Sequence, residues 1–376
     1  MSSKNLLLCL AFGCSFITIE SQVFHNPGGN RISFGKDVKK TSSASYGDID
    51  GDGDIDVVIA NGRHWADYNE VYLNNGEGFF NTSYQLGKYK STTYAAELGD
   101  FNGDGFLDVA TGNDEAPNRL FFNDGEGNFQ EKGTFGGDTN PTRNITLADI
   151  DDDGDIDILI TNRGSQNEIC LNNGNGEFNE VRYFGEEDDS TIDVDVVDMD
   201  GDGDKDLVLA NRDGMQNYIY LNDDLSFEEK IPFGSGDDDT RSVAVGDING
   251  DGLNDIVLGN IGTANTICFG DKAMTFKNEM LLHSLEDVTF SLDLGDFNND
   301  GHLDVLVGNA EEKNLVYENE GKGQGFKPME LSSLEYDTYD IKFVDLNGNG
   351  YLDIIEANSD EVNVYYFNIL PYKKKK

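Results

Sequence analysis

Residues 48–56 read Asp-Ile-Asp-Gly-Asp-Gly-Asp-Ile-Asp, and this acidic loop is the first of seven copies in a chain of 376 residues. Successive copies are separated by one step of 52 residues and then by five steps of 49. A period near 50 residues indicates one supersecondary unit that is repeated in an array. The first aspartates of the copies are Asp48, Asp100, Asp149, Asp198, Asp247, Asp296 and Asp345.

Each unit has the pattern of four short strands. In the unit that begins at Thr240, residues 240–246 alternate polar with apolar side chains, and residues 256–259 after the acidic loop are apolar throughout. Both patterns are typical of β-strands. A third strand follows a short turn, and a weaker fourth strand leads to the next unit. A threonine stands seven residues before every acidic loop, and we expect its hydroxyl to close the turn into the first strand.

The two ends of the repeat array predict a closed ring. The last unit lacks a fourth strand, whereas a spare strand at 31–35 precedes the first unit. A ring in which the N-terminal strand completes the last blade protects both sheet edges, while an open stack would need polar caps that are not visible. We therefore predict an all-β, seven-bladed β-propeller over residues 28–370, with four antiparallel strands per blade and the last blade closed by the N-terminal strand.

Composition limits the classes of partner. The chain has 44 glycines and only 6 prolines, which suits short strands joined by tight turns. Its formal net charge of −45 would repel DNA, RNA and anionic lipid surfaces. Cations are the natural counterpart of such a protein.

The termini differ from the repeats. An apolar run at 6–19 follows Lys4 and is too short to span a bilayer, but it fits a secretory signal. We expect a signal peptide at 1–21, no transmembrane segment after its removal, and a secreted or cell-surface protein. Residues 371–376 form a basic C-terminal tail.

The acidic loops have the ligand spacing of a calcium site. Calcium accepts six to eight oxygen ligands, and the loop supplies carboxylates at positions 1, 3, 5 and 9 with a carbonyl at position 7. The candidate ligands are Asp48, Asp50, Asp52, Asp54 and Asp56; Asp100, Asn102, Asp104 and Asp108; Asp149, Asp151, Asp153 and Asp157; Asp198, Asp200, Asp202 and Asp206; Asp247, Asn249, Asp251 and Asp255; Asp296, Asn298, Asp300 and Asp304; and Asp345, Asn347, Asn349 and Asp353. We predict up to seven Ca²⁺ ions, one per blade, with a mainly structural role.

Two details refine this prediction. Position 6 is glycine in every copy, which allows the sharp bend of a calcium loop. The bidentate glutamate that ends an EF-hand loop is replaced by apolar residues or threonine in six copies, and strands flank the loops, so these are not EF-hands. The seventh loop has only two carboxylates and is expected to bind most weakly.

The sequence resembles the FG-GAP and VCBS repeat family, whose best-known members are the propellers of integrin alpha subunits. The resemblance covers the whole mature chain and rests on the acidic loops and on the Phe-Gly pairs 34–35, 135–136, 184–185 and 233–234. The family's Gly-Ala-Pro half is replaced, as in Ala60-Asn61, which favours the VCBS-like branch. The resemblance implies a seven-bladed propeller with calcium in its blades that is used for extracellular recognition.

A ligand is expected on the face opposite the acidic loops. There the segment 61–69 is about three residues longer than its counterparts and contains the only tryptophan. Arginines gather on the same face, which would suit an acidic peptide or a carboxylated or sulfated sugar. Alternatively, the arginines pair with Asp188, Asp213 and residues 237–239, and the tryptophan plugs the channel. The candidate ligand-binding residues are Arg63, His64, Trp65, Tyr68, Arg143, Arg163, Arg212 and Arg241.

These observations favour a monomeric adhesion or recognition module that binds a protein or carbohydrate ligand. Two alternatives remain open, a carbohydrate-active enzyme of the polysaccharide lyase type or a lectin, and a structural surface-coat protein. The only constellation that could serve an enzyme is His64 with Tyr68 and Arg63, because no nucleophile elbow, phosphate loop or zinc cluster is present. We therefore predict a protein without catalytic residues.

Overall fold

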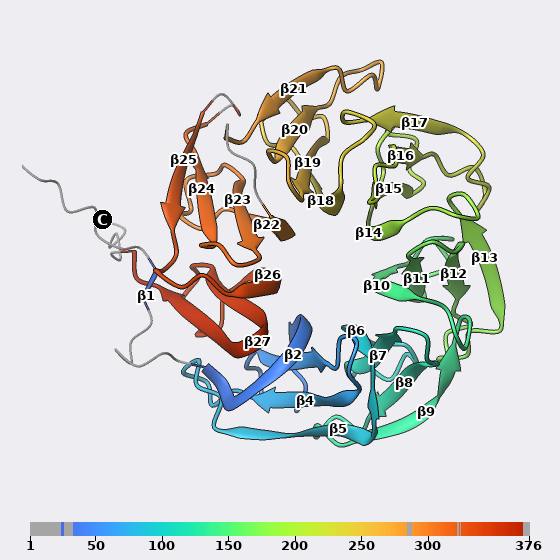
Figure 1. The fold of residues 1–376 in the computed structure, drawn as a ribbon. Helices are drawn as coiled ribbons and strands as arrows, with labels where there is room; N and C mark the ends of the chain where they lie inside the picture. The colour runs from blue at the N-terminus through green and yellow to red at the C-terminus, as the bar shows by residue number, and fades with distance from the viewer. Residues whose placement is uncertain (1–23, 26–32, 284–287, 322, 324, 371–376) are drawn as a thin grey trace, which may run out of the picture.

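The computed structural model describes residues 24–25, 33–283, 288–321, 323 and 325–370, and within these ranges it contains β-strands and no helix. The strands form sheets arranged in a ring around a central channel (Figure 1). The predicted all-β propeller architecture is confirmed. The predicted signal peptide at 1–21 and the basic tail at 371–376 lie outside the described residues. In the part of the chain that is described, no helix is long and apolar enough to cross a membrane.

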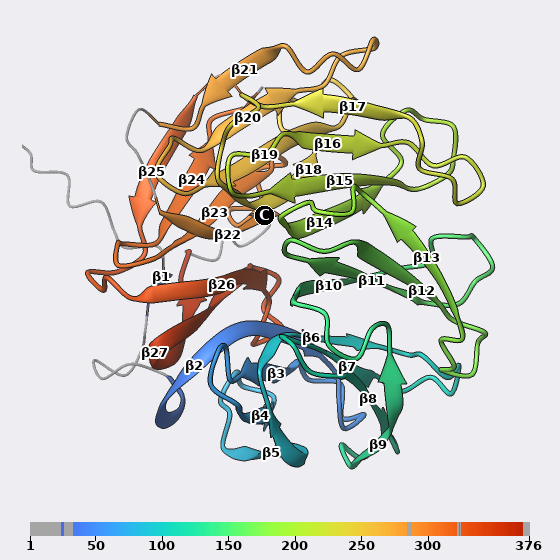
Figure 2. The same ribbon diagram turned by 45° about the vertical axis from the view of Figure 1, so that its right-hand side comes forward.

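Five sheets have four strands each, and their order follows the chain from the channel to the rim (Figure 2). The first strands, beside the channel, are β6 (Thr93–Gly99), β10 (Thr142–Ala148), β14 (Thr191–Val197), β18 (Thr240–Gly246) and β22 (Thr289–Gly295). The second are β7 (Asp108–Asn113), β11 (Asp157–Asn162), β15 (Asp206–Asn211), β19 (Asp255–Asn260) and β23 (Asp304–Asn309). The third are β8 (Asn118–Asn123), β12 (Asn167–Leu171), β16 (Asn217–Tyr220), β20 (Thr266–Phe269) and β24 (Leu315–Asn319). The fourth, on the rim, are β9 (Phe129–Phe135), β13 (Glu180–Phe184), β17 (Lys230–Phe233), β21 (Asn278–Leu281) and β25 (Phe326–Glu330).

The sixth sheet has seven strands and contains both the first and the last repeat unit. Its strands are β1 (Phe24–His25), β2 (Ser33–Gly47), β3 (Asp56–Asn61), β4 (Asp67–Leu73), β5 (Thr82–Ser91), β26 (Asp337–Val344) and β27 (Asp353–Asn368). The start of β2 pairs with the second half of β27, so the N-terminal strand joins the sheet of the last unit.

The predicted number of blades is wrong. The described residues form six blades, five with four strands and one with seven, instead of seven four-stranded blades. The cause is the backbone pairing of Lys39 with Glu361 and of Lys40 with Ser359, which carries the ladder across the junction between the first and last units. Since β2 and β27 are unbroken strands of 15 and 16 residues, the seven acidic loops are distributed over six sheets.

Each second strand is buried on both faces because it lies between two neighbouring repeat units. In β19, Ile256 packs with Phe233 of the preceding blade, whereas Val257 packs with Leu292 of the following blade. Alternate side chains of a strand point to opposite faces of the sheet, so a strand with two packed neighbours needs apolar residues throughout. This requirement explains the continuous apolar runs after the acidic loops.

Three of the four Phe-Gly pairs mark the ends of fourth strands, at Phe135, Phe184 and Phe233, and the pair at 34–35 lies near the start of β2. Phe233 is 2% exposed and belongs to the core between two blades, and Gly234 after it has φ +72°. Such a positive φ is strained for most residues and free for glycine. The phenylalanine thus anchors the outer strand, and the glycine turns the chain toward the next blade.

The recurrent threonine joins adjacent repeat units. Thr240 is fully buried, and its hydroxyl donates to Asn260 Oδ1 (2.9 Å) while accepting a hydrogen bond from Asn217 Nδ2 of the preceding blade (2.8 Å). Between the last and the first unit, Asn363 Nδ2 donates to Thr41 Oγ1 at 3.1 Å. These hydrogen bonds therefore link repeat units around the ring and do more than close a local turn.

Side chains from the preceding repeat unit cap the inner strand edges along the channel. Asp193 Oδ2 of β14 accepts a hydrogen bond from the backbone N–H of Val243 in β18 (3.1 Å), and Asp340 Oδ2 of β26 accepts one from Ala44 in β2 (3.0 Å). An inner strand would otherwise present unpaired backbone groups to the channel. The polar channel lining thus satisfies the edges of the sheets.

Candidate functional site

The acidic loops lie at one end of the first strands, and the backbone of each loop is folded around its first aspartate. Asp48 Oδ1 accepts a hydrogen bond from Gly51 N (2.8 Å), and its Oδ2 accepts one from Gly53 N (3.1 Å). The predicted bend at position 6 is confirmed. The glycines there all have positive φ, and they are Gly53 (+91°), Gly105 (+88°), Gly154 (+96°), Gly203 (+107°), Gly252 (+84°), Gly301 (+93°) and Gly350 (+82°).

The aspartate at position 9 connects the loop to the third strand of its blade. Asp56 is fully buried; its Oδ2 accepts from Ile49 N of the loop (2.9 Å) and its Oδ1 accepts from Asn74 N after the third strand (2.8 Å). Each of the other six loops makes the same pair of contacts, through Asp108, Asp157, Asp206, Asp255, Asp304 and Asp353. Position 9 is therefore a structural residue as well as a candidate metal ligand.

Three of the loops bring the carboxylates of positions 1, 3 and 9 together, with oxygen atoms within 4.8 Å of one another. The three groups are Asp48, Asp50 and Asp56; Asp149, Asp151 and Asp157; and Asp198, Asp200 and Asp206. Position 3 is asparagine in the remaining loops, namely Asn102, Asn249, Asn298 and Asn347. Position 5 lies outside these groups, and Asp52 Oδ1 accepts a hydrogen bond from Asp54 N at 3.0 Å.

The donor atoms of these groups fit a hard divalent cation. Asp50 Oδ1 and Asp149 Oδ1 are buried and accept no hydrogen bond from the described residues. A buried carboxylate oxygen without a partner is costly, and calcium prefers oxygen ligands of this kind. Positions 1, 3 and 9 would therefore hold the ion, which would neutralise carboxylates that the fold holds close together.

The pKa values of the loop carboxyls show that placing these carboxylates close together is unfavourable. Burial, together with the charges of Asp52 and Asp48, raises the pKa of Asp50. Burial also raises the pKa of Asp56 to about 6 and that of Asp304 to about 7, although backbone hydrogen bonds act in the opposite direction. Without a cation, the folded loop thus disfavours the ionised form of its own side chains.

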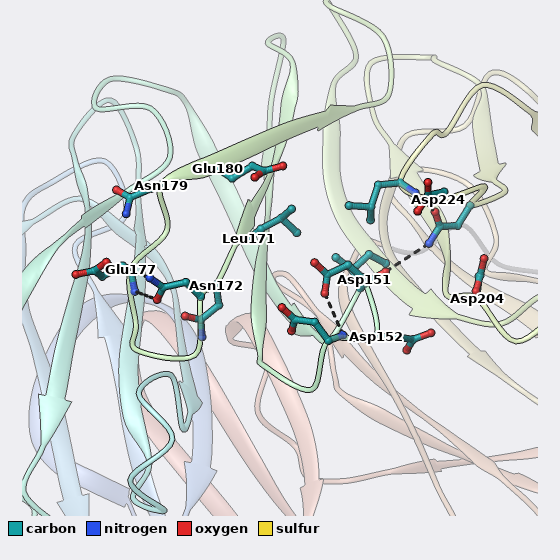
Figure 3. Close-up of a pocket in the computed structure, with 14 residues that line it drawn as sticks. Asp151, Asp152, Leu171, Asn172, Glu177, Asn179, Glu180, Asp204 and Asp224 are labelled. Carbon is teal, nitrogen blue, oxygen red and sulfur yellow. Dashed lines mark hydrogen bonds between the residues drawn. The ribbon is translucent and has the colours of Figure 1, made fainter.

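A cleft of about 620 Å³ adjoins the third acidic loop, and half of the residues that line it are acidic (Figure 3). Asp151 and Asp152 approach it from one blade, and Asp204 and Asp224 approach it from the next. Lys205 partly balances this charge, since its ammonium lies 3.1 Å from Asp152. This end of the molecule is therefore suited to cations.

The opposite end of the channel carries aromatic and cationic side chains. Every first strand has a register irregularity between its threonine and the residue two positions later, which is the pattern of a β-bulge. A bulge changes the direction of a side chain. The residues directly after the threonines line a channel cavity of about 460 Å³, among them Tyr94, Arg143, Arg241, Phe290 and Tyr339.

Several of the predicted ligand-binding residues meet at this mouth. Arg63 lies over the ring of Tyr339, with its guanidinium carbon 3.8 Å from the ring centroid. Arg241 lies between Phe290 (4.5 Å) and Tyr339 (4.9 Å). Arg212 directly follows Asn211, which pairs with the recurrent Thr191, so it lies at the same end of the strands as Arg241, and its charge helps to lower the pKa of Arg241.

Other predicted ligand-binding residues have partners of their own. Arg143 forms an ion pair with Asp114 at 2.6 Å, and Arg163 pairs with Asp213 at 2.7 Å. Tyr68 packs with Lys90, whose ammonium lies 5.2 Å from the ring centroid.

Trp65 is 72% exposed and does not plug the channel. Of the predicted acidic partners, Asp213 pairs with an arginine, Arg163. Arg143 pairs with Asp114, which was not among the predicted partners.

His64 lies beside Tyr94 and Asp114 instead of Tyr68. Its Nε2 is 3.0 Å from the Tyr94 hydroxyl, and its Nδ1 is 3.9 Å from Asp114 Oδ2. Burial and the charge of Arg63 lower the pKa of His64 and so favour the neutral imidazole.

Sequence reasoning missed four residues of this mouth, Tyr94, Asp114, Phe290 and Tyr339. Three of them directly follow a recurrent threonine, and that shared place in the repeat is the signal that could have identified them.

The repeat sequence itself decides the family. A family model described as FG-GAP-like repeat matches residues 48–111, 100–160, 149–209, 198–258 and 260–356, which is most of the chain. The chain belongs to the FG-GAP-like repeat family. The matches to the FG-GAP-like repeat begin at four successive acidic loops, so the loop and the strands around it form the unit that defines the family.

Solved structures share the fold of this FG-GAP-like chain at low identity. One is BBS1N in complex with ARL6DN, with 12% identity and a TM-score of 0.61 over 94% of this chain and 98% of that one. Another is the extracellular domain of the putative one-component system BT4673 from B. thetaiotaomicron, with 12% identity and a TM-score of 0.60 over 92% of this chain and 40% of that one. No curated protein sequence matches the chain.

Proposed function

We propose that this protein is an extracellular recognition module whose acidic loops bind calcium. The ions stabilise the propeller, and the face at the channel mouth binds a protein or carbohydrate ligand. The observation that carries the proposal is the convergence of three carboxylates within 4.8 Å in three separate loops, together with the unpartnered buried oxygens of Asp50 and Asp149.

Physical reasoning supports a structural role for the metal. Calcium carries two positive charges and takes six to eight oxygen ligands, so one ion connects the start, middle and end of each loop. A ligand that binds only the folded state stabilises it by about 2.7 kcal/mol at a free concentration of 100 times its dissociation constant. Several such sites in a protein of net charge −45 make calcium a major contribution to stability.

The solved structures support the recognition role at the level of the fold. BBS1N was determined in complex with ARL6DN, and the BT4673 segment is an extracellular domain. A propeller of this kind can therefore serve both as a partner-binding domain and outside the cell. We place this chain in the same functional class, with the ligand at the mouth because aromatic and cationic groups gather at that end of the channel.

Calorimetric titration of the metal-free full chain with CaCl₂ tests the calcium proposal. We expect binding of several ions, and the variants Asp50→Asn and Asp149→Asn should each weaken or remove one site. The control Glu228→Gln removes a charge from an exposed residue outside the loops and should leave the titration unchanged. A titration without binding, or one that responds equally to all three substitutions, would contradict the proposal.

A further inference from the structure

Three arginines at the channel mouth contain buried donors without acceptors. The Nε atoms of Arg63, Arg212 and Arg241 are buried and donate no hydrogen bond to any described residue. Arg63 uses its remaining nitrogens, which donate to the hydroxyls of Tyr339 and Ser359. The guanidinium groups of Arg212 and Arg241 form no hydrogen bond or ion pair within the described residues. Buried donors of this kind normally have a partner, so their number at one place requires an explanation.

Aromatic rings stack against the guanidinium groups of Arg63 and Arg241 but do not accept hydrogen bonds from their buried Nε–H donors. The guanidinium plane of Arg241 lies against Phe290 and Tyr339, and Arg63 covers the same tyrosine ring. A stacked guanidinium interacts through its face, while its N–H groups point outward in the plane. The edge of Arg241 thus remains available for an acceptor that the described residues do not supply, whereas Arg63 keeps only its Nε–H for such an acceptor.

The local charge balance favours an anion. Asp114 is engaged by Arg143, and Asp213 is engaged by Arg163. Burial lowers the pKa of Arg241 to about 10, and the charges of Arg212 and Arg63 act in the same direction. Arg241 therefore stays charged at neutral pH beside two like charges, although the protein as a whole is strongly acidic.

We propose that the guanidinium groups of Arg63, Arg212 and Arg241 form a binding site for an oxyanion, namely a carboxylate or a sulfate group on a small acidic sugar. The inference rests on the recognition role proposed above and specifies its ligand chemistry. Paired N–H donors of a guanidinium edge match two oxygens of a carboxylate or sulfate, and such charge-assisted hydrogen bonds are among the strongest in proteins.

The interior of the channel limits how far the ligand enters. Deeper in the cavity of about 460 Å³ lie Glu97, Asp195 and Asp293, with Lys342 as their positive neighbour. An anion is repelled by these carboxylates, so the oxyanion stays at the arginine level and the rest of the sugar extends into solvent. The site therefore favours a ligand with a single anionic group at its end.

Calorimetry on the calcium-loaded full chain, at constant ionic strength, tests this site. The probes are sodium sulfate, sodium glucuronate and neutral glucose. We expect sulfate, glucuronate or both to bind and glucose not to bind, and the anion that binds identifies the group. Arg241→Gln and Arg212→Gln should each weaken binding about tenfold or more, as expected for the loss of a hydrogen bond to a charged group. Arg182→Gln, which removes an exposed arginine of β13 on the rim, should leave binding unchanged.

The outcomes separate this proposal from the proposed calcium role. Absence of binding by both anions, or equal affinity of the wild type and the Arg241→Gln and Arg212→Gln variants, would overturn the oxyanion site. Calcium titration of the same variants shows whether they retain their metal sites and their fold. A normal calcium titration without anion binding would therefore refute only the site at the mouth.

Discussion

The two ends of the channel strands carry opposite chemistry and are built in different ways. At one end, the acidic loop is repeated with the same glycine bend and the same buried aspartate at position 9 in every unit. At the other end, the residue after the recurrent threonine changes from unit to unit and is serine, tyrosine, arginine, isoleucine, arginine, phenylalanine or tyrosine. Repeated positions hold the ring together, whereas the positions that differ are free to form one specific site.

Within the acidic loop, position 9 should matter most for folding. Asp157→Ala removes two hydrogen bonds from a carboxylate to buried backbone N–H groups, so we expect a loss of about 3–5 kcal/mol of unfolding free energy even with chelator present. The matched variant Asp153→Ala changes an exposed residue at position 5 of the same loop. It should cost less than about 1 kcal/mol under those conditions. Urea unfolding measures both, and equal losses would contradict the structural role of position 9.

Glu356 should make the unfolding free energy depend on pH. Burial raises the pKa of its carboxyl to about 7, so the folded state retains the proton up to that pH while the unfolded state loses it above about 4.3. Stability should therefore fall by about 3 kcal/mol as pH rises from 4.3 to 7. Glu356→Gln lacks this contribution, and the difference between wild type and variant isolates it. Unfolding curves of both proteins are measured at pH 5 and at pH 8, at constant free calcium. The same difference in unfolding free energy at both pH values would exclude the effect.

The recurrent threonine should contribute to the ring through its hydroxyl. Thr240→Val keeps the shape and loses two buried hydrogen bonds, with Asn217 and Asn260, so we expect a loss of about 2 kcal/mol. Thr263→Val, whose hydroxyl forms a long contact with Asp238 at an exposed position, serves as the control and should stay within about 0.5 kcal/mol of wild type. An unchanged midpoint of unfolding for Thr240→Val would show that the hydroxyl does not link the units.

The smallest effect is expected at the tryptophan. Trp65 is 72% exposed, so Trp65→Ala should change the unfolding free energy by less than about 0.5 kcal/mol. Chemical denaturation followed by circular dichroism provides the value. A loss above 1.5 kcal/mol would mean that the side chain packs against the mouth and would weaken the distinction between scaffold and ligand face.

The scaffold end could be predicted from sequence because its signals are local and repeated. The spacing of Asp48 and its six equivalents, and the glycine at position 6, follow directly from the residues. The number of blades could not be predicted in this way. It depends on pairing between Lys39 and Glu361, which are remote in sequence and carry no pattern that distinguishes a continuous ladder from a broken one.

The mouth was predicted only in part, because its geometry depends on backbone irregularities. The arginines were found by their charge, but Phe290 and Tyr339 were not identified. A bulge after each threonine directs these rings into the channel, and strict alternation does not anticipate it. Asp114 was also missed, since its pairing with Arg143 joins two blades.

The melting temperature of the full chain with excess calcium and with excess chelator tests the central claim most directly. If the acidic loops bind calcium as structural ions, the chelator should lower the midpoint by more than about 10 °C, because each occupied site adds a few kcal/mol to the unfolding free energy. Magnesium at the same concentration should restore less of this stability, since it prefers a smaller octahedral site. The same midpoint in calcium and in chelator would contradict the account.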